Sequence, residues 1–170
     1  MRGIHSKPNN GLSNDWITPK PIIDSLGGWE SFALDPCCPS EMPWRTARAM
    51  LFVDRYDGLK SNWEGRTWLN PPYGSQLRKW ISKLADHGDG IALVPSRTEV
   101  ESWFWPYVWE RADAVLFLRG RLYFHRPDGT SLGNAGHGSV LVAYGPANVE
   151  SLVKSGIAGR LVELKRKDGE

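Results

Sequence analysis

The sequence predicts an α/β fold, in which a mostly parallel sheet carries helices on both faces and an antiparallel hairpin at one edge. Short apolar runs typical of buried strands alternate along the chain with stretches of helical periodicity. The clearest pair is residues 76–87, whose apolar side chains recur with the helical period, and residues 90–95, an apolar run bounded by glycine and proline. A late strand at residues 139–144 follows a glycine-rich segment, which indicates the antiparallel edge.

The first half of the chain begins with a short helix that has recognisable ends. Thr18 is placed to cap it, Pro19 lies in its first turn, and a pair of glycines at 27 and 28 stops it. Residues 31–34 then form a short buried strand that ends at Asp35. The other elements expected in this half are a helix at residues 46–50, a strand at 51–53 and a strand at 66–69.

The second half continues the alternation of strands and helices. Its expected elements are the helix at 76–87, the strand at 90–95, a helix at 99–111, strands at 113–118 and 139–144, and a closing helix at 149–157. Pro106 interrupts the third of these, because proline inside a helix ends or kinks it. Residues 127–138 contain four glycines, so a mobile loop is expected there.

Length and composition indicate one domain. With 170 residues and 41% apolar content, the chain can build a continuous core, and we assign the domain to residues 15–162. Residues 1–14 are expected to form a flexible arm and residues 163–170 a charged tail. The chain has no run of about 18 apolar residues and no apolar signal-peptide region at its start, so a soluble cytoplasmic protein is expected.

Charge and cysteine usage narrow the classes of function. The net charge of +2 is too small to indicate nucleic-acid binding by itself, so a phosphate-facing surface has to come from local clustering. Cys37 and Cys38 are adjacent, which disfavours a disulfide between them, and the cysteine and histidine spacing of a zinc site is absent. A metal is therefore not expected. The nine tryptophans are assigned mainly to packing in the core.

The most informative stretch is Asn70-Pro71-Pro72-Tyr73, which follows the strand at 66–69. Proline fixes its own φ and disfavours helix at the residue before it, so the polar groups of Asn70 and Pro71 become prearranged acceptors. A carboxamide oxygen and a carbonyl beside an aromatic ring suit a planar amino group. The stretch therefore predicts a rigid loop that holds an amino-group substrate.

Polar residues follow several of the predicted strands. Asp35, Asn70 and the pair Ser96-Arg97 each come directly after one. Since α/β sheets hold ligands at the carboxyl ends of their strands, these residues are expected to converge on an active site. For Asp35 and Asp57 a second interpretation stays open beside a role in the site. Asp35 precedes a proline and can simply start a turn, and Asp57 can be an ordinary solvated turn residue.

Arginine is interleaved with aromatic residues between positions 119 and 126. Arg119, Arg121 and Arg126 flank Tyr123 and Phe124, a local pattern that can contact phosphates and stack on bases. A solvated hairpin rim explains the same pattern, so both interpretations stay open.

Together these segments resemble the phage-type DNA N6-adenine methyltransferases, small enzymes that depend on S-adenosylmethionine. Asn70-Pro71-Pro72-Tyr73 resembles the catalytic motif of amino-group methyltransferases, and Trp16-x-Thr18-Pro19 resembles their N-terminal cofactor-binding segment. Further similar segments, in order and at similar spacing, are Leu34-Asp35-Pro36, Asp57-Gly58-Leu59 with Trp63, Pro95-x-Arg97-Thr98 with Trp103-Phe104, and Gly120-Arg121-Leu122-x-Phe124. The resemblance covers residues 15–145.

The resemblance implies a Rossmann-like methyltransferase sheet and a mechanism. The target adenine of DNA flips out of the duplex into the motif loop, where Tyr73 stacks on the base. The Asn70 side-chain oxygen and the Pro71 carbonyl accept hydrogen bonds from the exocyclic amine, and Pro72 belongs to the same catalytic loop. A metal is not needed, because the sulfonium already activates the methyl group. The residues implied for S-adenosylmethionine binding are Trp16, Thr18, Pro19, Asp35, Pro36 and Asp57.

If the acceptor is DNA, the candidates for contact with it are Arg97, Arg119, Arg121 and Arg126. The loop at 127–138, with His125 and His137, is the candidate for reading the groove; that this loop is only a flexible connection stays open as well. One departure from many adenine methyltransferases is Cys37-Cys38-Pro39-Ser40, which stands where they have a glycine-rich loop.

Two alternatives stay open at this point. One is methylation of another amino group, on RNA adenine or protein glutamine, because the tetrapeptide also occurs in such enzymes. The other is a catalytically inactive DNA-binding relative. Both a monomer and a homodimer are compatible with the sequence, and a phage-encoded enzyme would work in the cytoplasm of its host cell.

Overall fold

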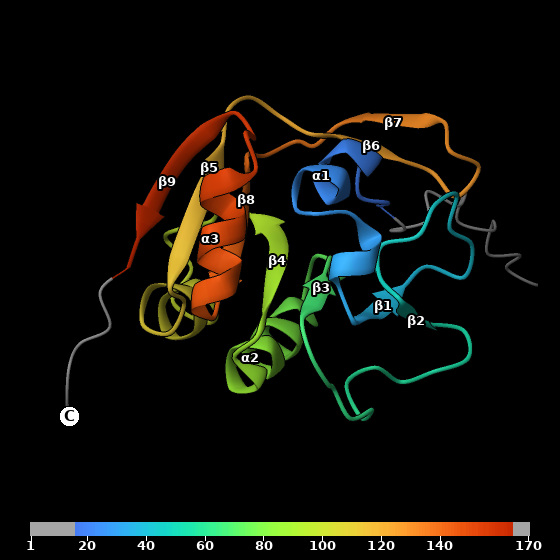
Figure 1. Cartoon of the computed structure of the whole chain (residues 1–170), viewed down its shortest axis with the longest axis horizontal. Helices are drawn as coiled ribbons and strands as arrows, with labels where there is room; N and C mark the ends of the chain where they lie inside the picture. Colours follow the sequence, from blue (N-terminus) through green and yellow to red (C-terminus); the bar gives the residue numbers. More distant parts are fainter. Residues whose placement is uncertain (1–15, 165–170) are drawn as a thin grey trace, which may run out of the picture.

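The structure, a computed structural model, describes residues 16–164, and within them the chain forms nine strands. These are β1 (Leu34–Cys38), β2 (Ala49–Phe52), β3 (Thr67–Leu69), β4 (Gly90–Pro95), β5 (Ala114–Leu118), β6 (Tyr123–His125), β7 (Ser131–Asn134), β8 (Ser139–Tyr144) and β9 (Gly159–Glu163). Seven of them form one sheet in the order β2-β1-β3-β4-β8-β5-β9, whereas β6 and β7 pair in a separate hairpin at the top of Figure 1. In the same part of the chain, no helix combines the length and apolarity that crossing a membrane requires.

Most strands of the main sheet point the same way. β2, β1, β3 and β4 pair in parallel, and β8 runs antiparallel between β4 and β5. This confirms the predicted α/β class with a mostly parallel sheet. The late strand predicted at 139–144 is β8, which is buried along its whole length and therefore lies inside the sheet; the antiparallel edge is β9.

Helices cover both faces of the sheet, as predicted. They are α1 (Lys20–Ser25), α2 (Leu77–His87) and α3 (Pro146–Lys154), together with two short turns of helix, η1 (Trp29–Ser31) and η2 (Trp105–Trp109). α2 and η2 pack on one face, and α1 and α3 pack on the other. The helix predicted at 76–87 is therefore confirmed as α2.

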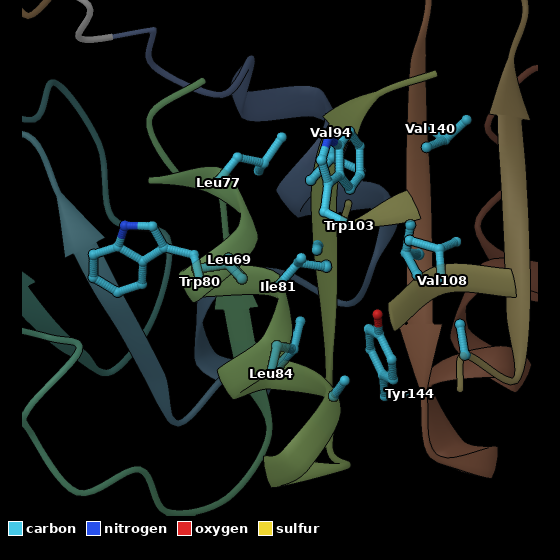
Figure 2. Close-up of a cluster of buried hydrophobic side chains, with 14 of the residues drawn as sticks. Leu69, Leu77, Trp80, Ile81, Leu84, Val94, Trp103, Val108, Val140 and Tyr144 are labelled. Atoms are coloured by element: carbon cyan, nitrogen blue, oxygen red, sulfur yellow. The ribbon is translucent and has the colours of Figure 1, made fainter. Parts of the chain in front are cut away.

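Each face has its own apolar core, because side chains of a strand alternate between the two faces of a sheet. In β4, Ala92 and Val94 point into the core under α2, whereas Ile91 and Leu93 point into the core under α1 and α3. The first core is drawn in Figure 2, where Leu77, Trp80, Ile81 and Leu84 of α2 lie over Leu69, Val94, Val140 and Tyr144 of the sheet.

β1 differs from the strand predicted at residues 31–34. Ser31 closes the short helical turn η1, and the strand begins only at Leu34. It then continues through Asp35 and Pro36, where its register against β2 is irregular. Such an irregularity accommodates proline, which has no N–H to donate to a neighbouring strand. Asp35 therefore lies inside a buried strand and does not start a turn after it.

The helix predicted at residues 46–50 is wrong. The Thr46 hydroxyl donates to the Asp35 carboxylate at 2.5 Å, and the N–H of Ala49 donates to the Ala33 carbonyl at 2.9 Å. From Ala49 onwards the chain is β2. Pairing with the neighbouring strand outweighs the local helical preference of this segment.

Three other segments also differ from the sequence-based expectation. The helix predicted at 99–111 contracts to η2, with Pro106 in its first turn, where the missing N–H matters least. The loop expected at 127–138 contains β7, which pairs with β6. β9 was not predicted, because it is an edge strand with mostly exposed residues and so lacks a strong apolar pattern.

Candidate active site

A cavity of about 400 Å³ lies beyond the carboxyl end of β3, where Asn70 follows the strand. All four residues of the predicted motif loop line it. Among residues 16–164, the lining consists of Trp16, Cys37, Pro39, Val53, Asn70, Pro71, Pro72, Tyr73 and His137. Its volume falls within the range of about 300–1,000 Å³ that is typical of small-molecule and cofactor sites.

The Asn70 carboxamide is held in one orientation by the N-terminal segment of the domain. Its nitrogen Nδ2 donates to the Trp16 carbonyl at 2.6 Å and to the Thr18 hydroxyl at 3.1 Å. The Cys37 thiol donates to the Asn70 backbone carbonyl at 3.3 Å. Within residues 16–164, Oδ1 has no donor, so this oxygen is the free acceptor of the amide.

The predicted role of Thr18 as a helix cap is wrong. Pro19 occupies the N-cap of α1, and this cap has no side-chain hydrogen bond. The Thr18 hydroxyl bonds to Asn70 instead, and the Thr18 carbonyl accepts a hydrogen bond from Trp44 Nε1 at 3.0 Å. The two bonds turn this residue away from the helix and towards the cavity wall.

Aromatic rings form a second wall of the cavity. The Trp16 ring lies 5.6 Å from that of Tyr73, and it stacks with the His137 ring at 6.0 Å and an interplanar angle of 15°. Phe124 of β6 supports both Trp16 and Tyr73 from behind. Burial raises the pKa of Tyr73, so its phenol stays protonated at neutral pH. Trp16 and Tyr73 therefore offer flat, uncharged rings to the cavity.

Asp35 lies in β1, behind the lining residue Cys37, and is only 4% exposed. Its carboxylate accepts hydrogen bonds from the Thr46 hydroxyl at 2.5 Å and from the N–H of Cys37 at 3.2 Å. Burial raises the pKa of Asp35 despite these bonds, and burial together with the nearby Asp35 charge raises the pKa of the Cys37 thiol. Cys37 is accordingly a neutral thiol that donates to Asn70, without the thiolate character of a nucleophile.

The burial of Asp35 predicts a pH-dependent effect of Asp35→Asn on stability. Because the pKa is raised in the folded state, the stability from this group is complete below the unfolded value of about 3.8 and is lost as the pH rises through the folded pKa. The asparagine of this variant carries no charge; its oxygen can accept from the Cys37 N–H, and its NH2 group can donate to the Thr46 hydroxyl. We expect the free energy of unfolding of the variant, relative to wild type, to increase between pH 4 and pH 7 by about 1.4 kcal/mol per unit of pKa difference. Urea unfolding of both proteins across this range measures it, and a difference that stays constant contradicts it.

Asp57 lies in an exposed turn that packs against β1. Its carboxylate pairs with Lys60 at 3.1 Å and accepts the N–H of Leu59 at 3.1 Å, and the hydrogen bond with Lys60 lowers the pKa of Asp57. The neighbouring Gly58 is so close to β1 that a Cβ on it would lie 1.9 Å from the Pro36 carbonyl oxygen. The Asp57 turn and the Asp35-Pro36 segment are thus in direct contact.

The predicted DNA-contacting arginines lie on the surface, and none of them lines the cavity. Arg97 follows β4 and pairs with Glu99 at 3.3 Å. Arg119, Arg121 and Arg126 are exposed along the segment that joins β5 to β8. Of the residues expected to converge at the carboxyl ends of the strands, Asn70 lines the cavity, whereas Asp35, Ser96 and Arg97 are not among its lining residues.

Comparison with known families decides the class of the protein. The model of the DNA N-6-adenine-methyltransferase (Dam) family matches residues 5–160. The chain belongs to this family. No curated protein and no solved structure matches it significantly. Membership of the Dam family confirms the resemblance inferred from the motifs and indicates a DNA adenine N6-methyltransferase, a transferase that acts on DNA.

Several residues at the site of this Dam family member were not predicted from the sequence. Pro39 and Val53 line the cavity, Trp44 anchors Thr18, and Thr46 bonds to Asp35. Cys37 and Pro39 were noted only within the segment Cys37-Cys38-Pro39-Ser40, and Cys37 also as a poor disulfide partner. None of these residues has a motif spacing of its own. The signal that could have found Pro39 is its position directly after β1, the strand beside β3, whereas Val53 follows β2, two strands from β3. Between residues 16 and 164 no group of three or more His, Cys, Asp or Glu side chains could hold a metal ion.

Proposed function

We propose that this Dam family member transfers a methyl group from S-adenosylmethionine to the exocyclic amine of an adenine that is flipped out of DNA at a specific site. The observation that carries this proposal is the orientation of Asn70 in the cavity wall. Both protons of its amide are used by Trp16 and Thr18, so its oxygen is left to accept a hydrogen bond from an amino group.

The motif loop would hold the base in the following way. The Asn70 side-chain oxygen and the Pro71 carbonyl accept the two amine protons, which fixes the nitrogen and directs its lone pair. Tyr73 offers a flat, uncharged ring on which the base stacks, and Pro72 keeps the loop rigid. Positioning and electrostatic stabilisation are then the main contributions of the protein.

The rest of the cavity fits a cofactor of this kind. A volume of about 400 Å³ with aromatic and proline walls suits a small molecule that carries a heteroaromatic ring. When bound, S-adenosylmethionine supplies a methyl group activated by its sulfonium. Trp16 lines the cavity, and we propose that the contacting segments Asp35-Pro36 and Asp57 form the adjoining part of the site. The assignment of Thr18 and Pro19 to the cofactor remains a prediction from the resemblance.

We propose the exposed arginines for DNA contact. Arg119, Arg121 and Arg126 lie on the segment that also provides Phe124 and His137 to the site, so phosphates bound there would be close to the cavity. Arg97 follows β4, on the other side of β8 from these three arginines, and would contact the DNA backbone there. Replacing a phosphate-binding arginine by glutamine lowers the salt dependence of DNA binding by about one charge, and an unchanged slope would remove that residue from the interface.

The direct test is a labelled-methyl assay with duplex DNA, RNA and protein as separate acceptors. The expected result is label in DNA only, recovered as N6-methyladenine after nucleoside digestion. Label in RNA or in protein glutamine would show that this molecule, and not DNA adenine, is the acceptor. Absence of transfer together with absence of S-adenosylmethionine binding by calorimetry would identify an inactive relative. Sequencing of the methylated DNA gives the recognition site from the same sample.

Tyr73 provides a matched pair of variants. Tyr73→Ala removes the stacking ring, and since base–aromatic stacking contributes roughly 1–3 kcal/mol, kcat/KM for DNA is expected to fall by about 10–100-fold. Tyr73→Phe keeps the ring and loses only a long contact from the hydroxyl to the Leu93 carbonyl at 3.5 Å. Its kcat/KM is expected to stay within about threefold of wild type. Equal losses in both variants would show that the hydroxyl matters and not the ring.

A further inference from the structure

The motif loop alone does not determine which end of the Asn70 amide faces the cavity. The oxygen and nitrogen ends of a carboxamide have nearly the same shape, so packing cannot distinguish them. If the amide turned over, its NH2 group would face the cavity and oppose an incoming amine. The proposed reaction therefore requires hydrogen-bond partners that select one end.

Those partners come from a segment 52 and 54 residues earlier in the chain. The Trp16 carbonyl can only accept, so it requires the nitrogen of Asn70 to face it. The Thr18 hydroxyl can donate as well as accept, so it does not select the end by itself; with the nitrogen already fixed by the Trp16 carbonyl, it accepts the second proton and leaves the nitrogen without a free one. Thr18 is 1% exposed, and water cannot replace its hydroxyl at that position.

The segment that carries these acceptors is itself fixed from three sides. Ile17 and His125 exchange backbone hydrogen bonds of 3.0 and 3.1 Å, which attaches the segment to β6. Trp44 Nε1 donates to the Thr18 carbonyl at 3.0 Å. The Trp16 ring packs against Tyr73. Two of these three attachments, from His125 and Trp44, lie outside the motif loop, so other parts of the fold preorganise the acceptors.

We propose that Thr18 is a positioning residue for methyl transfer: it orients the Asn70 amide so that Oδ1 faces the substrate amine. This role rests on the proposed function of Asn70 and differs from the cofactor contact that the family resemblance implies for Thr18. A cofactor contact acts on the affinity for S-adenosylmethionine. A positioning residue acts on turnover, because the amide contacts the substrate amine and not the cofactor.

Kinetics of three variants separate these roles. Thr18→Val keeps the shape and removes the acceptor, so kcat is expected to fall by about 10–100-fold with the affinity for S-adenosylmethionine within about twofold of wild type. Thr18→Ser restores the hydroxyl and is expected to recover kcat to within about threefold. Thr67→Val is the matched control, because Thr67 is an equally buried threonine at the far end of β3 whose hydroxyl bonds to the Gly65 carbonyl.

A spectroscopic measurement tests the same inference without any activity. In the 1H–15N spectrum of the labelled full chain, the side-chain NH2 pair of Asn70 is assigned by its loss in Asn70→Asp. Thr18→Val is expected to shift this pair, Thr18→Ser to return it close to its wild-type position, and Thr67→Val to leave it in place.

The outcomes distinguish failure of the inference from failure of the proposed function. An unmoved NH2 pair in Thr18→Val overturns the positioning role, and so does a loss of cofactor affinity with unchanged kcat. If wild type transfers no methyl group to any acceptor while the NH2 pair still responds to Thr18→Val, the orientation of the amide stands and the proposed reaction fails.

Discussion

Asn70→Ala is expected to lower the turnover of methyl transfer by at least about 100-fold, the loss seen when one preorganised hydrogen-bonding group of an active site is removed. The variant loses the carboxamide oxygen that is proposed to accept from the substrate amine, and it also leaves the Trp16 carbonyl and Thr18 hydroxyl without their shared donor. Affinity for S-adenosylmethionine is expected to stay nearly intact, because the amide is proposed to contact the substrate amine. Single-turnover kinetics with saturating DNA, together with calorimetry for the cofactor, measure the two effects separately.

Asn62→Ala is the control for this experiment. Asn62 is exposed, and its amide donates to Glu64 at 3.2 Å on the surface before β3. Its turnover is expected to match that of wild type. Undiminished turnover in Asn70→Ala would remove Asn70 from the reaction, and an equal loss of cofactor affinity and turnover would assign it to the cofactor.

Gly58→Ala is expected to give the largest loss of stability among conservative substitutions near the site. A Cβ at this position would lie 1.9 Å from the Pro36 carbonyl oxygen and 3.0 Å from the Trp80 ring, so the Asp57 turn has to move away from β1. Overpacking of this kind costs typically 1–3 kcal/mol, and contact with rigid backbone places it at about 3 kcal/mol or more. The melting temperature is then expected to fall by about 6–12 °C.

Gly136→Ala is the matched control, because a Cβ at that glycine would have no atom of residues 16–164 within 4 Å apart from its chain neighbours. Its melting temperature is expected to stay within about 2 °C of wild type. Since Gly58 connects two segments proposed for the cofactor, Gly58→Ala is also expected to weaken S-adenosylmethionine binding. A variant with unchanged melting temperature would show that the Asp57 turn can shift without cost.

Sequence periodicity predicted the helices and strands that are buried on at least one face, because burial gives their sequence a regular apolar pattern. α2 has one apolar face, and β4 and β8 are buried along their whole length, so each carries a complete local signal. The helix predicted at residues 46–50 was wrong because the Thr46 hydroxyl and nearby backbone groups bond to the segment of β1. Such long-range pairing is not part of local helix propensity. β9 was missed because an exposed edge strand needs little apolar surface.

The site shows the same division between local and long-range information. That Asn70 would follow a strand and begin a rigid loop could be predicted, because the prolines after it restrict the backbone locally, and the structure places Asn70 in a cavity wall. The partner that orients its amide could not, because Thr18 is 52 residues away and its position depends on β6 and Trp44. The same residue looked like a helix cap when only its neighbours in sequence were considered.

The antiparallel insertion of β8 has a consequence for how such a chain can diversify. β5 and β8 are antiparallel neighbours, with Phe117 opposite Val140. Residues 119–138 therefore leave the sheet at the end of β5 and return to it at the start of β8, at the same end of this strand pair. The entropy of closing such an excursion grows slowly with its length. Residues can therefore be added or removed at the turn between β6 and β7 without altering the register of any strand in the main sheet. This plan lets a short chain vary the surface that we propose for contact with a long polymer, while the frame that holds the motif loop stays the same.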